Sequence, residues 1–293
     1  MIKKILIITE AYPPILNSAA KLIDELACEL RQTGWEVIIL TETYSDNFSL
    51  NNKSYKNTYY IPKILSKRKG FILRGIRELL VPFVYGVKAK KLVKKYEIEN
   101  VFIYSPPLSM GLIKLFLAQK VILNIQDIFP QYAKDLGIIK SKIIFNFYLY
   151  LQKFIIKKND HVITQSYECK EYLRKISPES MGKIFAVNNW QAFSESKFNS
   201  STSKKNSSNK IKIIYCGNIG PAQDIINFIF KIKTCPNIEL DIYGAGSEKE
   251  KIIEKCSDLL NIKIFDELDQ AQLESVFDNC RCFGLSSVIV LNI

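Results

Sequence analysis

The residues of this 293-residue chain with chemical potential lie mainly in three loops, at 10–20, 104–109 and 124–130. Each loop follows an apolar, β-branched run and precedes a stretch with helical periodicity. The carboxyl ends of parallel strands share one sheet edge, where ligands bind, so we expect the three loops to line a common crevice. Asp127 in the third loop is a candidate general base, although an Asp at this position also suits a helix cap. The prolines of the first loop also fit a purely rigid connection.

Two glycine turns, Gly217–Gly220 and Gly244–Gly246, lie later in the chain between expected strands and helices. Glycine lets a phosphate approach the backbone closely, so two such turns at one sheet edge favour a nucleotide diphosphate. Either turn alone is equally compatible with an ordinary connection. The first strand is not followed by G-x-G-x-x-G, which argues against a dinucleotide site.

Other catalytic classes have little to build on in this sequence. His161 is the only histidine, and we interpret it as structural. The seven cysteines are dispersed, with no C-x-x-C pair, as in a cytosolic protein with reduced thiols. We therefore expect no metal site and no Ser/His/Asp triad.

Around these loops the sequence alternates between strand and helix patterns. Residues 4–9 and 35–41 are short apolar runs, and between them apolar residues recur with helical spacing from Ala19 to Leu30. Gly34 occupies the position expected just after a helix end. Further strands are expected at 58–61, 101–104, 121–126, 161–165 and 184–188, and helices at 71–95, 107–119, 141–158 and 168–176. The pattern predicts a doubly wound α/β domain over 1–193.

A Ser-, Asn- and Lys-rich segment at 194–209 reads as a flexible linker. A second α/β pattern occupies 210–293, and Ser247 with Glu250 fits a capping box that opens a helix. Its strands are expected at 211–216, 238–243 and 262–265, and its helices at 222–233, 247–260 and 270–279. The prediction is two Rossmann-like doubly wound domains, the second incomplete.

Charge is distributed unevenly along the chain, whose net charge is +12. Residues 63–95 hold eleven Lys and Arg, interleaved with apolar side chains, and one acid. This pattern predicts a membrane-surface element, with a solvated helix face as the simpler alternative and nucleic acid as the least favoured partner. The residues expected to face the membrane are Lys67, Arg68, Lys69, Arg74 and Arg77. No run is long and apolar enough for a bilayer span, so the expected location is cytoplasmic and peripheral to the inner membrane.

Several segments, in this order and spacing, resemble the retaining glycosyltransferases of family 4, which have the two-domain GT-B architecture. The nearest resemblance is to the L-fucosamine transferases of bacterial O-antigen and capsule synthesis. The matching segments are 11–14, 34–41, 104–107, 126–130, 136–137, 160–166, 187–190, 215–220 with 222–223, and 243–246.

The resemblance implies transfer of a sugar, with N-acetyl-L-fucosamine as a candidate, from a UDP-sugar or other nucleotide-sugar donor to a lipid-linked glycan. The donor diphosphate is then expected in a cleft between the two domains, with no metal or cofactor. Asp127 and the loop of Asn17 and Ser18 are expected to face the sugar and the acceptor. The expected donor-binding residues are Asn17, Ser18, Gly217, Asn218, Gly220, Gln223, Gly244 and Gly246.

The chain departs from this family pattern at three places. Asn17 and Ser18 replace two glycines, and Asn218 and Gln223 stand where many relatives carry Arg and Lys. The family's Glu-x7-Glu segment is not found before residue 293. Three alternatives therefore stay open: an inactive truncated remnant, a membrane-binding module without catalysis, and a GT-B epimerase acting on a nucleotide sugar.

Overall fold

The structure is a computed structural model that describes residues 2–15, 17–43, 57–62, 71–190, 211–268, 272, 275 and 276. Within these ranges it does not describe the side chains of 71–76, 79 and 222. The chain divides into two compact units, Met1–Glu195 and Ser196–Ile293. The predicted linker 194–209 lies outside the described residues.

Unit 1 is built on a seven-stranded, all-parallel sheet with the order β3-β2-β1-β4-β5-β6-β7. This confirms the predicted doubly wound α/β architecture. The strands are β1 (Lys4–Ile8), β2 (Glu36–Glu42), β3 (Thr58–Ile61), β4 (Asn100–Ser105), β5 (Lys120–Ile125), β6 (His161–Thr164) and β7 (Ile184–Ala186). The helices are α1 (Ser18–Gln32), α2 (Phe71–Tyr96), η2 (Leu108–Phe116), α3 (Gln131–Asp135), α4 (Lys142–Lys158), α5 (Tyr167–Ile176) and η3 (Pro178–Lys183).

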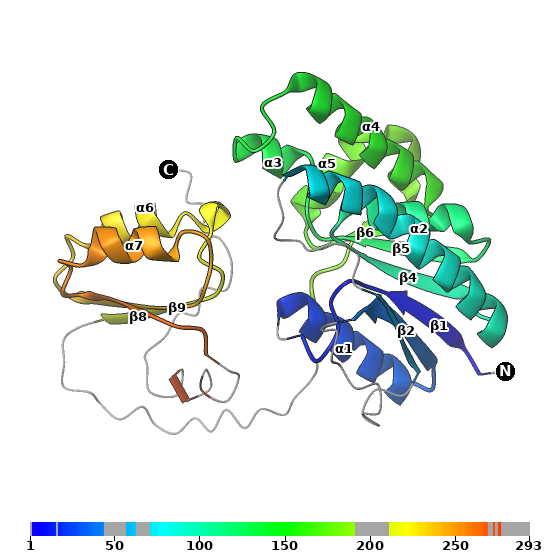
Figure 1. Ribbon diagram of the computed structural model, residues 1–293, viewed down its shortest axis with the longest axis horizontal. Coiled ribbons are helices and arrows are strands. Elements are labelled where there is room, and N and C mark those ends of the chain that lie inside the picture. Colours follow the sequence, from blue (N-terminus) through cyan, green and yellow to red (C-terminus); the bar gives the residue numbers. More distant parts are fainter. Residues whose placement is uncertain are drawn as a thin grey trace. The chain divides into compact units, whose positions relative to one another are not determined.

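The central strands are apolar on both faces because helices cover both sides of the sheet. Leu6, Ile7 and Ile8 of β1 are fully buried, as parallel strands between two helical layers must be. Figure 1 shows α1 on one face of the sheet and α2 and α4 on the other. Two separate cores result, a small one under α1 and a large one under α2, η2, α4 and α5.

The helix α1 ends where the sequence predicts, whereas the helix predicted at 107–119 takes a different form. Gly34 follows the end of α1 with φ of 87°, as expected for a glycine that terminates a helix. The helix predicted at 107–119 is instead the shorter 3-10 helix η2. Its Gly111 packs so tightly that an added Cβ would lie 2.3 Å from Ile155 Cγ2.

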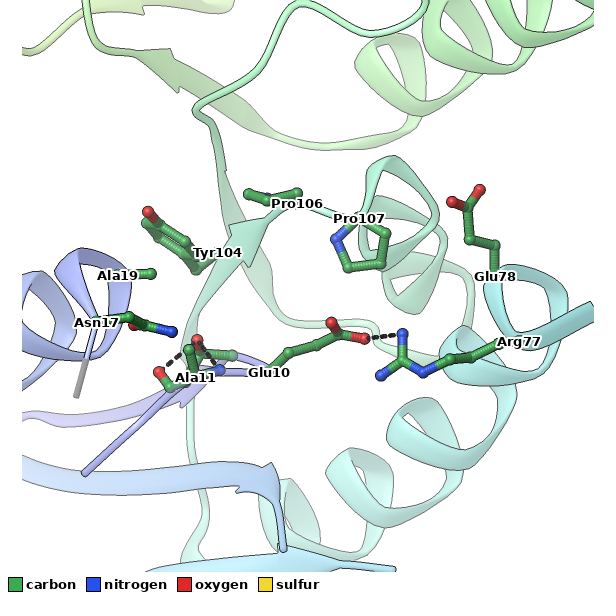
Figure 2. Close-up of a pocket in the computed structure, with 10 residues that line it drawn as sticks. Glu10, Ala11, Asn17, Ala19, Arg77, Glu78, Tyr104, Pro106 and Pro107 are labelled. Atoms are coloured by element: carbon green, nitrogen blue, oxygen red, sulfur yellow. Dashed lines mark hydrogen bonds and ion pairs between the residues drawn. The ribbon is translucent and has the colours of Figure 1, made fainter. Parts of the chain in front are cut away.

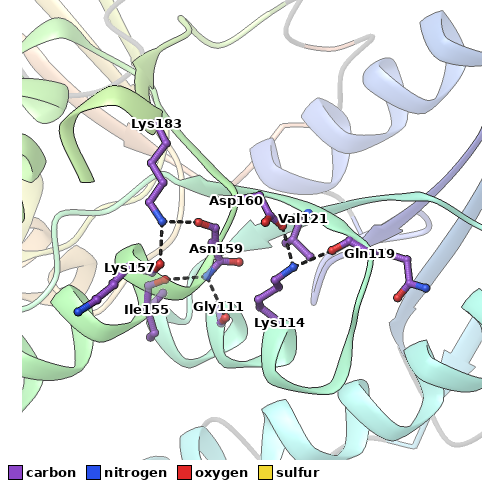
Figure 3. A network of polar contacts seen from close by, with 9 residues as sticks. All are labelled: Gly111, Lys114, Gln119, Val121, Ile155, Lys157, Asn159, Asp160 and Lys183. Atoms are coloured by element: carbon purple, nitrogen blue, oxygen red, sulfur yellow. Dashed lines mark hydrogen bonds and ion pairs between the residues drawn. The ribbon is translucent and has the colours of Figure 1, made fainter. Parts of the chain in front are cut away.

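A polar network ties η2 to the amino ends of β5 and β6 (Figure 3). The Asp160 carboxylate accepts hydrogen bonds from Lys114 Nζ at 2.7 Å and from the Val121 backbone N–H at 2.8 Å. Asn159 donates to the Gly111 carbonyl, and Lys183 donates to the Asn159 carbonyl. Burial alone would raise the pKa of Asp160, but these bonds and the charge of Lys114 outweigh it and lower that pKa.

Unit 2 contains a parallel sheet with the order β10-β9-β8 among the described residues. Figure 1 shows α6 and α7 on the same side of this sheet, and apolar side chains from both helices and all three strands form its core. The elements are β8 (Ile211–Cys216), η4 (Pro221–Gln223), α6 (Ile225–Ile232), β9 (Ile238–Tyr243), α7 (Lys249–Cys256) and β10 (Ile262–Phe265). Most of the predicted helix 270–279 lies outside the described residues.

Two helix starts in unit 2 differ from prediction. The helix expected over 222–233 is split into η4 and α6 because Asp224 between them adopts a left-handed conformation with φ of 48°. The capping box at Ser247 is wrong: α7 begins at Lys249, and its N-cap is Glu248, without a side-chain capping bond in the described structure.

Candidate functional site

A cavity of about 330 Å³ opens at the carboxyl edge of the unit 1 sheet. The chain supplies its walls from the loops after β1 and β4, the start of α1 and the first half of α2. The lining residues are Thr9, Glu10, Ala11, Asn17, Ala19, Arg77, Glu78, Tyr104, Pro106 and Pro107. Two of the three predicted loops therefore do meet here, as strand order requires.

Arg77 and Glu10 reach toward one another across this cavity (Figure 2). Arg77 Nη1 lies 2.7 Å from Glu10 Oε1, and Arg77 Nη2 lies 3.0 Å from Oε2 of Glu42 at the end of β2. Burial alone would lower the pKa of Arg77, but the two carboxylates more than offset this and raise it. The ion pairs join α2 to the carboxyl ends of two neighbouring strands.

The position of Arg77 corrects one sequence-based assignment. Arg77 was expected to face a membrane surface, but it is only 5% exposed. The prediction was wrong because the Arg77 side chain, although it belongs to a basic run, is buried and forms ion pairs with Glu10 and Glu42. Lys67, Arg68 and Lys69, together with the side chain of Arg74, lie outside the described residues.

The charge of the cavity favours uncharged ligands rich in hydroxyl groups. Glu10 and Glu42 both pair with the guanidinium of Arg77, and Glu78 adds a further carboxylate, which accepts a hydrogen bond from Tyr148. Carboxylate oxygens accept hydrogen bonds from hydroxyl groups but repel phosphate oxygens. A sugar ring suits this lining better than a diphosphate does.

Asn17 has a structural role that its sequence position alone did not reveal. It is the N-cap of α1, and its Oδ1 accepts a hydrogen bond from the Ala20 backbone N–H at 2.8 Å. Ser18 is the first residue of the helix, and both side chains are exposed. Asn17 therefore both caps the helix and lines the cavity, where its Nδ2 group points away from the capping bond.

Asp127 lies in the loop between β5 and α3, and its environment changes its acidity. The side chain is accessible, yet the surrounding protein removes enough water to raise its pKa above the ordinary value for Asp. Tyr104, in the cavity wall, has its pKa raised to about 12 by burial and by the charge of Asp127. Asp127 therefore lies close enough to the cavity to act electrostatically on its wall. The helix cap considered as an alternative is not formed, since α3 has Pro130 as its N-cap.

A chain of side-chain amides supports the loop that carries Asp127, and sequence reasoning missed it. Gln126 Nε2 donates to Asn124 Oδ1 at 2.8 Å, and Gln165 Nε2 donates to the backbone carbonyl of Gln126 at 2.9 Å. Asn189 extends the chain by donating to Gln165 at 3.2 Å. The signal available in the sequence was the recurrence of Asn and Gln just after three consecutive strands.

In unit 2 the two glycine turns pack directly against one another. A Cβ on Gly244 would lie 1.9 Å from the Gly217 carbonyl oxygen, and one on Gly246 would lie 2.1 Å from the Ile219 carbonyl oxygen. The Ile219 N–H also donates to the Ala245 carbonyl at 2.8 Å. Close backbone contact within the protein thus explains why positions 244 and 246 require glycine, whether or not a ligand binds.

The two amides expected near the donor contact each other. Asn218 Nδ2 donates to Gln223 Oε1 at 3.0 Å, beside Gly220 in the turn between β8 and η4. Tyr215 fixes the same turn by donating to the Asn218 carbonyl at 2.6 Å. The turn is thus ordered by neutral hydrogen bonds. Among the described residues, no group of three or more His, Cys, Asp or Glu is arranged to hold a metal.

Comparisons with known proteins identify the fold. No family model and no curated protein sequence matches the chain. Among solved structures, sucrose-phosphate synthase from Thermosynechococcus elongatus matches 96% of this chain and 74% of its own, with a TM-score of 0.72 at 14% identity. Anabaena HepE in complex with UDP and glucose matches 95% and 72% of the two chains, with a TM-score of 0.60 at 10% identity. The lipopolysaccharide outer core galactosyltransferase WaaB matches 94% and 72%, with a TM-score of 0.60 at 14% identity.

At these identities the likeness establishes architecture and not activity. With its two parallel α/β units, the chain has the GT-B fold.

Proposed function

We propose that the protein is a glycosyltransferase that moves a sugar from a nucleotide-diphosphate donor to a lipid-linked glycan. N-acetyl-L-fucosamine is the sugar we favour, in O-antigen or capsule polysaccharide synthesis at the inner membrane leaflet. The observation that carries the proposal is the cavity of unit 1, in which Arg77 holds Glu10 at the carboxyl edge of a GT-B sheet. HepE, of similar fold, was crystallised with UDP and glucose, which supports a nucleotide-sugar donor.

The roles in unit 1 follow from charge. Glu10 and Glu78 accept hydrogen bonds from sugar hydroxyls in the cavity, and Asp127 is the candidate base for the acceptor hydroxyl. A raised pKa brings Asp127 closer to the proton affinity that a general base needs. In a retaining transfer the largest contribution then comes from stabilising the leaving diphosphate.

The donor diphosphate is assigned to the turn of unit 2 that contains Gly217 and Gly220. Asn218 and Gln223 are the side chains there that can donate hydrogen bonds to phosphate, after their mutual bond opens. Neither carries a positive charge, so backbone N–H groups must contribute much of the binding. Gly244 and Gly246 keep this turn in place and belong to the same donor region.

Titration calorimetry of the full chain with UDP and UDP-sugars tests the donor site, and transfer to lipid-linked acceptors tests the reaction. Micromolar UDP binding with transfer, and an axial or equatorial product linkage that matches the donor, supports a retaining glycosyltransferase. Release of an epimerised sugar without an acceptor would identify an epimerase instead. A folded chain that binds neither UDP nor any UDP-sugar would be an inactive relative, and the proposal would fail.

A further inference from the structure

The helix α4 has one buried face and one face exposed to solvent. Gln152, Ile155 and Ile156 point inward and are buried. On the opposite side, Ile143 is 83% exposed, Phe147 57% and Tyr150 72%. These three residues follow the spacing i, i+4 and i+7, so they form one stripe along the helix. We call this stripe the outer face of α4.

The exposure continues beyond the helix itself. Ile144, in the first turn of α4, is 42% exposed, and Leu136 and Ile138, just before the helix, are 39% and 54% exposed. Single apolar residues on a surface are ordinary, but a run of large ones on adjoining segments marks a surface that contacts a partner. Figure 1 shows α4 on the outside of the helical layer that covers the sheet of unit 1.

Exposed lysines flank the outer face of α4, and Glu179 of η3 lies near two of them, Lys153 and Lys157, whose charges contribute to lowering its pKa. The helix contains no Asp or Glu, and its lysines are all exposed: Lys142, Lys153, Lys157 and Lys158. Lys134 and Lys140 precede the helix and are also exposed, with one acid, Asp135, between them. On the helix, Lys153 and Lys157 lie three and seven residues after Tyr150, so they extend the same side of α4.

We propose that the outer face of α4 docks on an anionic lipid bilayer. Apolar and aromatic side chains in line with lysines are what an interfacial helix presents to a membrane, with the apolar groups below the headgroups and the lysines among the phosphates. A second copy of the chain fits less well, because a symmetric contact would set the lysines of one copy against those of the other. A bilayer span needs a long, continuously apolar helix, and the described part of the chain contains none.

The docking surface specifies where the membrane contact of the proposed function is made. It rests on that part of the proposed function and does not depend on sugar transfer. It places a docking surface on α4 in addition to the predicted one in 63–95, where the side chains of Lys67, Arg68, Lys69 and Arg74 lie outside the described residues. Arg77 of that segment is buried in ion pairs and cannot reach lipid.

The test is vesicle flotation of the full chain with neutral phosphatidylcholine vesicles and with vesicles that contain phosphatidylglycerol as well. We expect binding to the anionic vesicles at low salt and weak binding to the neutral ones. In Ile143→Ser/Phe147→Ser/Tyr150→Ser the partition coefficient should fall about tenfold or more. Lys153→Glu/Lys157→Glu should lose roughly fivefold or more per residue at low salt, and less at high salt.

Matched controls make the result specific. Leu260→Ser removes an apolar side chain that is 97% exposed in unit 2, and Lys255→Glu reverses an exposed lysine there, so neither should change vesicle binding beyond twofold. Circular dichroism confirms folding of each variant. Vesicle binding that is equal in the wild type and the triple variant, or equal on neutral and anionic vesicles, would overturn the proposal. A dimer that dissociates in the triple variant, with vesicle binding unchanged, would identify a self-association surface instead.

The same variants separate this proposal from the proposed function. The proposed UDP site contains no residue of α4, so the variants in α4 should bind UDP like the wild type. Loss of vesicle binding with UDP binding intact supports the docking surface, whereas a wild-type chain that binds vesicles but no UDP would remove the enzyme proposal and leave the docking surface standing.

Discussion

Arg77 Nη1 lies 2.7 Å from Oε1 of Glu10, and this ion pair connects the middle of the sheet edge to the helix that covers it. Both side chains are less than a tenth exposed. Because Glu42 accepts from the other terminal nitrogen of the same guanidinium, one arginine holds the ends of β1 and β2 in place. Arg77 of α2 therefore fixes the position of Glu10 in the cavity wall.

Replacing Arg77 by Met should lower the free energy of unfolding by about 3–5 kcal/mol, because it removes a buried cation that forms ion pairs with two buried carboxylates. Chemical denaturation at pH 7 measures the change. Lys90→Met on the exposed side of the same helix is the control and should cost less than about 0.5 kcal/mol. Equal costs for the two variants would show that the ion pairs contribute nothing to stability.

Adding Glu10→Gln and Glu42→Gln to Arg77→Met should restore part of this loss. The cost of the single variant comes largely from buried negative charges that have lost an ion pair, and the amides remove these charges. A triple variant as unstable as the sum of its parts would contradict this explanation.

Asp127→Asn should lower sugar transfer about 100-fold or more while leaving UDP binding unchanged. The same variant should not reduce stability at pH 7. The folded-state pKa of Asp127 is raised, so the folded state holds its proton more tightly than the unfolded state, whose pKa is about 3.9. Stability is therefore lost as the pH rises through the window between these two values, and the amide avoids that loss.

The rate of transfer at low pH checks the role of Asp127 further. Activity should rise with pH through a midpoint higher than the ordinary pKa of Asp, since the base must be ionised and the pKa of Asp127 is raised. Asp135→Asn, at an exposed carboxylate of α3, is the matched control and should leave both rate and profile unchanged. A profile that is the same in Asp127→Asn and the wild type would exclude Asp127 as the base.

Gly244→Ala should destabilise unit 2 by about 3 kcal/mol, because its Cβ would overlap the Gly217 carbonyl oxygen. Hydrogen exchange of amides in β8 and β9 of the full chain measures the effect locally. Gly182→Ala in unit 1 is the control, as nothing lies within 4 Å of the added atom. Unchanged exchange in Gly244→Ala would mean that the two turns separate easily.

Gln223→Lys should tighten UDP binding about threefold to tenfold at low salt, because it places a positive charge where the diphosphate is proposed to bind. The gain should shrink as salt is added. Asn237→Lys makes the same charge change at the amino end of β9 and should have no such effect. If both variants bind UDP with wild-type affinity, the diphosphate does not lie at this turn.

Asp160→Asn should cost about 1–2 kcal/mol at pH 7, with the smaller value favoured because the carboxylate is 38% exposed and partly screened by water. The pKa of Asp160 is lowered in the folded state, so its contribution exists above the unfolded pKa of about 3.9 and disappears as the pH falls through the folded value. Denaturation at several pH values should therefore show a difference in the free energy of unfolding between wild type and variant at pH 7 that disappears in acid. A constant difference at every pH would show that the effect is not electrostatic.

The sequence alone was sufficient to predict that both units are α/β with parallel sheets, although only unit 1 has helices on both faces of its sheet among the described residues (Figure 1). Short β-branched runs such as Lys4–Ile8 alternate with helical periodicities, and this alternation specifies parallel sheets because each pattern is local and repeats within a few residues. The end of α1 before Gly34 was predictable for the same reason. The strand ends, in turn, placed Glu10 and Tyr104 at one sheet edge.

Only the tertiary structure decided which polar residues act together. Arg77 lies within a basic run, and nothing near it in the sequence shows that it forms a buried ion pair with Glu42, 35 residues earlier. Gly244 resembles a phosphate-binding glycine until the carbonyl of Gly217 is seen to occupy the space of its side chain. These assignments depend on contacts between residues far apart in the chain, and local periodicity carries no information about such contacts because it reflects only neighbouring residues.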